Sequence, residues 1–413
     1  MLDLKLLRQD PDGVRAALAR RGDDVPLDEV LDLDARRREL LPRVEGLRAE
    51  QNRASDGIAA AKRSGEDAAE AIARMKEVAG ELKGLQAELA QVDEQLQERL
   101  RHLPNLPDPR APAQDTVLRE VGEAGRTGRD HLELAGARVD MERGARLSGS
   151  RFAYLRGDLA RLELALVSWA MDKLAGHGFE AVIPPVLVRE EALYGTGFLP
   201  DTEQQIYRLP EDDLYLVGTS EVALASLHAG EVVDELPLRY AGFSPCFRRE
   251  AGAAGKDTRG IFRVHQFDKV EMFAYVEPDQ SDAEHERILA IEEEVLTDLG
   301  IPYRVVDIAV DDLGASAARK FDCEAWLPGQ GRYRELTSCS NTTDFQARRL
   351  GIRFRPEGGK PETLHTLNGT AVAVGRTIIA LLENGQRDDG SIAMPACLQA
   401  YGMPEALPSA VAA

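Results

Sequence analysis

The sequence predicts an α+β fold, in which an antiparallel β-sheet flanked by helices follows an antiparallel two-helix coiled-coil arm. Two observations predict this fold. Residues 27–101 hold no aromatic residue and repeat apolar side chains at heptad spacing, which is typical of a coiled coil. From about residue 115 to 403, short strand patterns outnumber helical ones and follow each other as hairpins do, which favours an antiparallel sheet over a βαβ series.

The arm is predicted as two helices folded back on each other. Ser64-Gly65-Glu66-Asp67 is a turn signal between two halves of similar length. Pro42 lies inside the first half, where it should kink the helix or mark a break near its base. The apolar seam comprises Leu33, Leu40, Val44, Leu47, Ala54, Ile58 and Ala61, and then Ile72, Met75, Ala79, Leu82, Leu89 and Leu96.

Composition shifts along the chain predict its domains. Residues 1–101 form the helical arm domain, and the four prolines within 102–114 form a linker because they cannot continue a helix. Residues 115–403 form the larger domain, and 404–413 form a disordered tail. Within the larger domain we expect helices over 155–174, 284–299 and 371–383, and strands over 181–188, 215–217, 271–276 and 303–310.

The 413 residues carry a net charge of −20, which argues against a protein that coats nucleic acid with its whole surface but allows a local basic patch. The four cysteines form no C-x-x-C pair, so we expect reduced thiols in a cytoplasmic protein. No apolar run reaches the length of a membrane helix, and no partner membrane is expected. The sequence lacks both the Rossmann and the P-loop nucleotide motifs.

The most informative stretch runs from Cys246 to Glu271. It reads as two strands joined by a glycine-rich, charged loop that contains Gly252, Gly255 and Gly260. Arginines flank the loop, and arginine grips phosphate or carboxylate through two hydrogen bonds. Phe267 could stack on a planar base, which together with the arginines suits a nucleoside triphosphate and a small zwitterion. Composition alone supports equally well a salt-bridged hairpin that binds no ligand.

Two further stretches carry polar groups suited to phosphates. In 333–341, Glu335 stands three residues before Ser338, and both could hold Mg²⁺, which prefers oxygen ligands. In 367–377, small residues lead into an apolar helix with Arg376 near its start, where it could bind an anion. The alternatives are a polar strand end and a packed helix with a surface arginine.

Together these stretches resemble the three signature motifs of class II aminoacyl-tRNA synthetases, and more closely the seryl-tRNA synthetases. Residues 178–185, ending in Pro185, resemble the first motif, which lies at the dimer interface. Phe247-Arg248-Arg249-Glu250 with Arg263 and Phe267 resembles the second, and Gly375-Arg376 the third. Residues 218–221, 264–267 and 335–338 match runs particular to the seryl branch. The resemblance covers essentially the whole chain and implies the class II fold of an antiparallel sheet with flanking helices.

The resemblance also implies roles for individual residues. Arg248 and Arg376 would be catalytic, with Arg248 bridging the ATP α-phosphate and the serine carboxylate. Glu335 and Ser338 would hold Mg²⁺ bound with ATP. The implied ATP-binding residues are Arg248, Arg249, Glu250, Arg263, Val264, Phe267, Glu335, Leu336, Thr337, Ser338 and Arg376, and the implied serine-binding residues are Thr219, Ser220, Glu221, Arg248, Glu271, Asn368 and Thr370.

The implied activity is a serine–tRNA ligase that uses ATP and Mg²⁺, with no zinc expected, and works as a homodimer. Its substrates would be L-serine and tRNA-Ser with a long variable arm, and also tRNA-Sec where one exists. The helical arm would grip the tRNA, although a dimerisation coiled coil or a solvated charged face is the plain alternative. The implied tRNA-binding residues are Arg48, Arg53, Lys62, Arg63, Arg74 and Lys76.

Departures from the family pattern keep two other hypotheses open. Thr337 and Thr370 stand where serine is common in the family, and residues 308–314 differ from a frequent family run. A paralog that activates serine for antibiotic biosynthesis or self-resistance is therefore an alternative. A tRNA-binding module with a dead active site is a third hypothesis, but it predicts missing arginines, and Arg248, Arg263 and Arg376 are all present.

Overall fold

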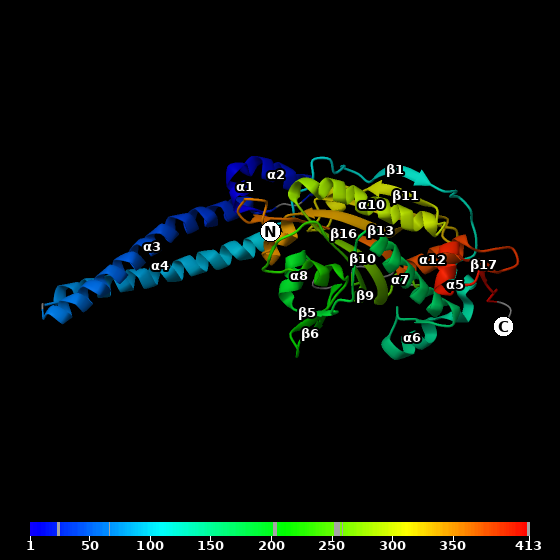
Figure 1. The fold of residues 1–413 in the computed structure, drawn as a ribbon, viewed down its shortest axis with the longest axis horizontal. Coiled ribbons are helices and arrows are strands. Elements are labelled where there is room, and N and C mark those ends of the chain that lie inside the picture. Colours follow the sequence, from blue (N-terminus) through cyan, green and yellow to red (C-terminus); the bar gives the residue numbers. More distant parts are fainter. Residues whose placement is uncertain (23–24, 66, 201–204, 252–256, 258, 411–413) are drawn as a thin grey trace. The chain divides into compact units, whose positions relative to one another are not determined.

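A computed structural model describes the chain except residues 23–24, 66, 201–204, 252–256, 258 and 411–413. Gly252 and Gly255 of the predicted glycine-rich loop therefore lie outside the described residues. The chain divides into two compact units, Met1–Pro104 and Asn105–Ala413, and each is described by itself (Figure 1). Within the described residues, no helix is long and apolar enough to cross a bilayer.

The first unit contains the predicted helical hairpin, formed by α3 (Leu27–Ser64) and α4 (Ala69–Arg101), which run side by side (Figure 1). Gly65 ends α3 in a left-handed conformation with φ of 77°, which glycine adopts without steric cost. Two short helices precede the hairpin, α1 (Leu4–Gln9) and α2 (Pro11–Arg20). The apolar seam between the long helices includes Leu40, Val44, Leu82, Leu85 and Val92.

Two expectations about the arm need correction. A break at Pro42 is wrong, because α3 continues through it without interruption. Pro42 is exposed, so water can satisfy the backbone carbonyl that loses its helical partner there. Ile72, predicted in the seam, is 42% exposed near the arm's far end.

The second unit is built on a twisted sheet of eight strands within the described residues. Its neighbours run antiparallel, except that the edge strand β4 lies parallel to β9. In spatial order the strands are β1 (Thr116–Val121), β11 (Tyr303–Asp307), β12 (Arg319–Leu327), β13 (Arg332–Thr343), β16 (His365–Ala373), β10 (Gln266–Val276), β9 (Leu238–Phe247) and β4 (Glu180–Val182). The predicted antiparallel sheet is confirmed.

Helices pack on the sheet through one apolar cluster. Side chains of α7 (Asp158–Gly176), α10 (Ser281–Asp298) and α12 (Val374–Asn384) share that cluster with Val270, Met272 and Ala274 of β10. Because strand side chains alternate between faces, the intervening Lys269 and Glu271 point to the opposite side. There they line a cavity, which is how the sheet separates an apolar core from a polar site.

Short elements surround this sheet. The remaining helices are α5 (His131–Ala135), α6 (Met141–Ser148), α8 (Glu190–Thr196), α9 (Glu221–Ala225) and α11 (Phe345–Leu350). The remaining strands are β2 (Val139–Asp140), β3 (Tyr154–Leu155), β5 (Leu187–Val188), β6 (Tyr207–Leu209), β7 (Leu214–Leu216), β8 (Val232–Val233), β14 (Arg353–Phe354), β15 (Glu362–Thr363), β17 (Ile392–Ala393) and β18 (Ala406–Leu407).

Several predicted elements of this unit have other bounds in the structure. The strand predicted over 181–188 is split into β4 and β5, because Pro184 and Pro185 lack the N–H that a ladder needs. The helix predicted over 371–383 begins only at Val374, since residues 371–373 end β16. The strand predicted over 303–310 ends at Asp307, before the short 3₁₀ helix Val310–Asp312.

The prediction of a disordered tail over 404–413 is also wrong for the described residues 404–410. Ala406 and Leu407 form β18, which pairs antiparallel with β17, and Leu407 is fully buried. Apolar burial therefore fixes a segment whose composition resembled a free end. Residues 411–413 lie outside the described part of the chain.

The part of the proline-rich segment that belongs to the second unit is held there by Asn105. Its side-chain amide donates to the carbonyl oxygens of Ser316 and Thr342 at 2.9 and 2.8 Å. Val310 N–H donates to Pro112 O at 2.8 Å. These bonds hold residues 105–112 within the second unit, whereas the composition predicted a linker.

Candidate active site

A cavity of about 430 Å³ opens on the polar side of the sheet. Strands β10, β13 and β16 supply its floor, and residues that follow β9 and precede β10 supply one wall. Most of the residues implied by the sequence line this one cavity: Thr219, Glu221, Arg248, Glu250, Arg263, Val264, Phe267, Glu271, Glu335, Leu336, Thr337, Ser338, Asn368, Thr370 and Arg376.

Two predicted residues do not line the cavity. The Ser220 hydroxyl is fully buried and donates to Gly242 O at 3.4 Å, so it supports β9 from below. The Arg249 guanidinium lies 6.0 Å from the centre of the Tyr207 ring. Consecutive side chains of an extended segment point to opposite sides. Because Arg248 points into the cavity, Arg249 points away from it.

Arg248 stands at the middle of the cavity. Its Nε donates to Gly218 O at 3.1 Å, and its guanidinium carbon lies 5.3 Å from the Phe267 ring centre. A cation held over an aromatic face is stabilised by the ring quadrupole. The remaining guanidinium donors can therefore face an anionic group inside the cavity.

Two buried carboxyl groups lie at one end. Glu221 Oε1 accepts hydrogen bonds from Gln346 Nε2 at 2.8 Å and Asn368 Nδ2 at 3.0 Å. Burial, reinforced by the charge of Glu271, raises the pKa of Glu221 to about 7. Burial also raises the pKa of Glu271, although its ion pair with Lys269 opposes that shift. This end of the cavity suits a small cation that carries several N–H donors.

The other end combines a carboxylate with arginines. Arg376 lies in the first turn of α12, and its NH1 donates to Glu335 Oε1 at 3.1 Å. The Glu335 side chain is 52% exposed, and the charges of Arg376, Lys320 and Arg248 hold its pKa below the ordinary value. On the facing wall, Arg263 NH1 donates to Glu250 Oε2 at 2.6 Å. Arg376 and Arg263 at this end, with Arg248 at the middle of the cavity, suit a polyphosphate.

This end also offers oxygen ligands for a divalent cation. Glu335 and Ser338 both line the cavity, and their oxygens are of the type that Mg²⁺ prefers. Among the described residues, no three His, Cys, Asp or Glu side chains converge into a metal site. The chemistry of Glu335 and Ser338 fits Mg²⁺ that also takes phosphate oxygens as ligands.

Sequence reasoning missed several residues of the site. Lys269, Lys320 and Phe262 also line the cavity, and Gln346 holds Glu221 from outside it. Lys269 could have been found, because it precedes Glu271 by two residues on the same face of a strand. Gln346 had no local signal, since α11 meets Glu221 only through the tertiary fold.

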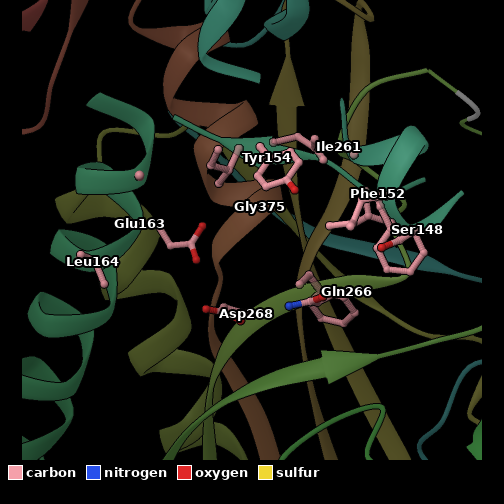
Figure 2. Close-up of a pocket in the computed structure, with 16 residues that line it drawn as sticks. Ser148, Phe152, Tyr154, Glu163, Leu164, Ile261, Gln266, Asp268 and Gly375 are labelled. Carbon is pink, nitrogen blue, oxygen red and sulfur yellow. The ribbon is translucent and has the colours of Figure 1, made fainter. Parts of the chain in front are cut away.

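A second cavity of about 520 Å³ shares the wall residues Ile261, Val264, Phe267 and Gly375 with the first. Figure 2 shows the side chains of Glu163 of α7 and Asp268 of β10 near each other at this cavity. Burial, together with the contact to Asp268, raises the pKa of Glu163 to about 7. The rim is apolar and open, since Leu147 and Leu164 are 72% and 67% exposed.

The residues proposed for tRNA lie on the surface of the helical hairpin. All six are exposed: Arg48, Arg53, Lys62, Arg63, Arg74 and Lys76. Arg74 also forms ion pairs with Glu50 at 3.2 Å and with Glu77 at 3.6 Å. The basic side chains are therefore interspersed with acidic ones.

Comparison with known proteins is consistent over the whole chain. Residues 1–107 match the seryl-tRNA synthetase N-terminal domain, and residues 205–385 match the tRNA synthetase class II core domain (G, H, P, S and T). The serine–tRNA ligase of Thermobifida fusca is 52% identical, and that of Streptomyces coelicolor is 53% identical, with 97% of each chain covered in both cases.

Solved structures agree with the sequence relatives. The seryl-tRNA synthetase from Pyrococcus horikoshii, complexed with ATP, matches with a TM-score of 0.92 at 40% identity, covering 99% of this chain and 100% of that one. The cytoplasmic serine–tRNA ligase from Naegleria fowleri, in complex with AMP, matches with a TM-score of 0.86 at 32% identity and covers 99% of both chains. The chain therefore belongs to the seryl-tRNA synthetase family of class II aminoacyl-tRNA synthetases.

Proposed function

We propose that this chain activates L-serine with ATP to seryl-adenylate and transfers the serine to the 3′ end of tRNA-Ser. One observation carries the proposal: a single cavity holds buried glutamates at one end, Arg263 and Arg376 with Glu335 at the other, and Arg248 between them. The first end suits the ammonium group of an amino acid, and the second suits a triphosphate. The P. horikoshii relative, solved with ATP, supports the same assignment.

The chemistry asks the protein for position and charge. The serine carboxylate oxygen attacks the α-phosphorus, a bond forms between them, and pyrophosphate leaves with the electrons of the broken P–O bond. No protein nucleophile is needed. Arg248, between the two ends of the cavity, would neutralise charge on the carboxylate and the α-phosphate. Arg263 and Arg376 would bind the departing phosphates.

The other proposed contacts follow the cavity from end to end. Phe267 would stack on the adenine ring and Glu250 would accept from its amino group, while Thr219, Glu221 and Glu271 would hold serine. Alanine lacks the serine hydroxyl and would leave polar groups of the pocket unpaired. The pocket would therefore reject alanine. Glu335 and Ser338 would hold Mg²⁺, which supplies further neutralisation of phosphate charge when bound.

Serine charging of deacylated total tRNA, with ATP and Mg²⁺, tests this function. We expect charging confined to tRNAs with a long variable arm, and tRNA-Sec among them where it is supplied. Arg248→Ala should lower the rate by about 10²–10³, the range seen when a group that stabilises transition-state charge is removed. Serine-dependent pyrophosphate exchange without tRNA charging would instead indicate another acceptor, as in the specialised paralog. The absence of both activities would contradict the proposal.

We also propose that the functional protein is a homodimer joined along β4 and α7. β4 is an edge strand of the main sheet, so its outer backbone groups have no partner within that sheet. Just beyond it, Ile183 is 83% exposed, and Leu164 on α7 is 67% exposed. Exposed large apolar side chains next to an open strand edge are typical of a subunit interface.

A further inference from the structure

His131, the first residue of α5, is buried between the end of α12 and the stem of the loop that leads to Arg263. It is 5% exposed. Its Nδ1 lies 3.3 Å from Glu383 Oε1, and its Nε2 accepts a hydrogen bond from Ile261 N–H at 3.3 Å. The imidazole therefore joins a helix end to the backbone of the loop stem.

The neighbours fix which ring nitrogen holds the proton. Nδ1 faces a carboxylate, so it donates, and Nε2 keeps its lone pair for Ile261 N–H. Glu383 is itself fully buried and held by two backbone donors, His131 N–H at 3.1 Å and Gly329 N–H at 2.8 Å. A fixed carboxylate thus orients the ring, and the oriented ring holds the amide of Ile261.

The backbone next to this hydrogen bond is shaped around the imidazole. Gly260 has a φ of +82°, and a Cβ added there would lie 2.1 Å from His131 Nε2. Only glycine lets the chain approach the ring so closely. The neighbouring Arg259 makes a second tie to α5 through Asp130 Oδ2 at 3.2 Å. The start of α5 therefore holds the loop stem at two consecutive residues, Asp130 and His131.

The held stem leads directly into the phosphate end of the cavity. Phe262 follows Ile261, and its ring lies under the guanidinium carbons of Arg376 and Arg334, at 4.7 and 3.8 Å from the ring centre. Arg263 comes next and donates to Glu250. A shift of Ile261 would displace Phe262 and with it the arginines assigned to the polyphosphate, and displacement of about 1 Å can cost a hundredfold in rate.

We propose that His131 is a positioning residue for ATP, which it serves by fixing the loop stem through the Ile261 amide. This inference rests on the proposed function for its meaning in catalysis, but the contact itself is independent of it. The His131–Glu383 pair does not touch the cavity and acts through Phe262, Arg263 and Arg376. Its loss should therefore impair ATP binding and leave serine binding intact.

Two substitutions in the full-length protein test the proposal. His131→Leu keeps the volume and removes the acceptor, whereas His131→Gln keeps an acceptor at similar reach. We expect the Leu variant to raise the KM for ATP about tenfold in pyrophosphate exchange, the effect of losing about 1.4 kcal/mol of interaction. We expect the KM for serine to stay within about twofold, and the Gln variant to recover most of the loss.

A control histidine and a measurement without catalysis separate the outcomes. His177 also pairs with a glutamate, Glu294 Oε2 at 3.0 Å, but at the end of α7, so His177→Gln should leave both KM values unchanged. Amide hydrogen exchange should rise in the peptide that contains Ile261 in His131→Leu only. The proposal would be overturned if the KM values for ATP and serine rose equally in His131→Leu. It would also be overturned if amide hydrogen exchange in the Ile261 peptide were unchanged. An inactive wild-type protein would refute the proposed function. Amide hydrogen exchange at Ile261 would still show whether His131 holds the loop stem.

Discussion

At the scale of single residues, burial decides the charge state of the site more than sequence neighbours do. Glu221 is the clearest case, because its pKa is about 7 and its carboxylate is assigned to the serine ammonium group. In the protein without serine, the Glu221 carboxyl group is therefore mostly protonated at pH values below its pKa of about 7. A protonated carboxyl binds an ammonium ion poorly, so serine must compete with a proton.

We therefore expect the KM for serine to rise as the pH falls from 8 to 6, approaching tenfold per pH unit below about pH 7. The KM for ATP should not follow the same curve. Steady-state pyrophosphate exchange over this pH range measures both. Glu221→Gln should have a high KM for serine that no longer varies with pH, and a wild-type KM without pH dependence would remove Glu221 from serine binding.

Glu292 of α10 shows a second effect of burial, beneath the floor of the site. It is fully buried, its Oε2 accepts from Thr337 Oγ1 at 2.7 Å, and its Oε1 has no hydrogen-bond partner among the described residues. Burial raises its pKa well above the ordinary value. The folded state therefore favours the protonated form, and stability is lost as the pH rises from the unfolded pKa through the folded one.

Glutamine at position 292 stays neutral at every pH, so its presence removes the loss of stability that the ionisation of Glu292 causes as the pH rises. We expect Glu292→Gln to gain stability relative to wild type between pH 5 and pH 8, as measured by urea unfolding at several pH values. Glu292→Leu leaves the Thr337 hydroxyl unpaired and should cost about 1–3 kcal/mol at pH 5. If the Gln and wild-type curves run parallel across this range, Glu292 does not titrate as its burial implies.

At the scale of elements, one strand edge and one helix carry the proposed dimer. Ile183→Asp combined with Leu164→Asp places charges on the exposed apolar side chains near β4 and α7. Because charges are strongly disfavoured in the centre of an interface, we expect the variant to be monomeric. Sedimentation velocity at micromolar concentration measures this. Leu227→Asp, at another exposed leucine, is the matched control, and a wild-type monomer would contradict the proposal.

At the scale of the whole molecule, we propose that the two units bind different partners, with tRNA on the helical hairpin and ATP and serine in the second unit. Lys62→Glu with Arg63→Glu reverses two charges near the tip of the helical hairpin. If the arm binds tRNA phosphates, the KM for tRNA should rise about tenfold and its salt dependence should weaken. Serine-dependent pyrophosphate exchange, which needs no tRNA, should stay within about twofold of wild type. A loss of both activities in a folded variant would argue against this division of roles.

The sequence by itself determined the features that depend on local patterns. The heptads and Gly65 determined the hairpin and its turn, because periodicity and a left-handed glycine act over a few residues. The resemblance in motif order identified most of the side chains that line the cavity, including Arg248, Glu271 and Arg376.

Only the tertiary structure decided features that depend on contacts far apart in the chain. Residues 371–373 look helical by hydrophobicity, yet they end a strand because pairing with β10 completes the sheet. The segment at Leu407 is ordered because β17 provides a partner and the core covers its side chain. His131 and Glu383 are 252 residues apart, and their contact with Ile261 exists only once α5, α12 and the loop stem are brought together. Local propensity carries no information about such contacts, because their free energy arises from burial and hydrogen bonds formed between distant segments.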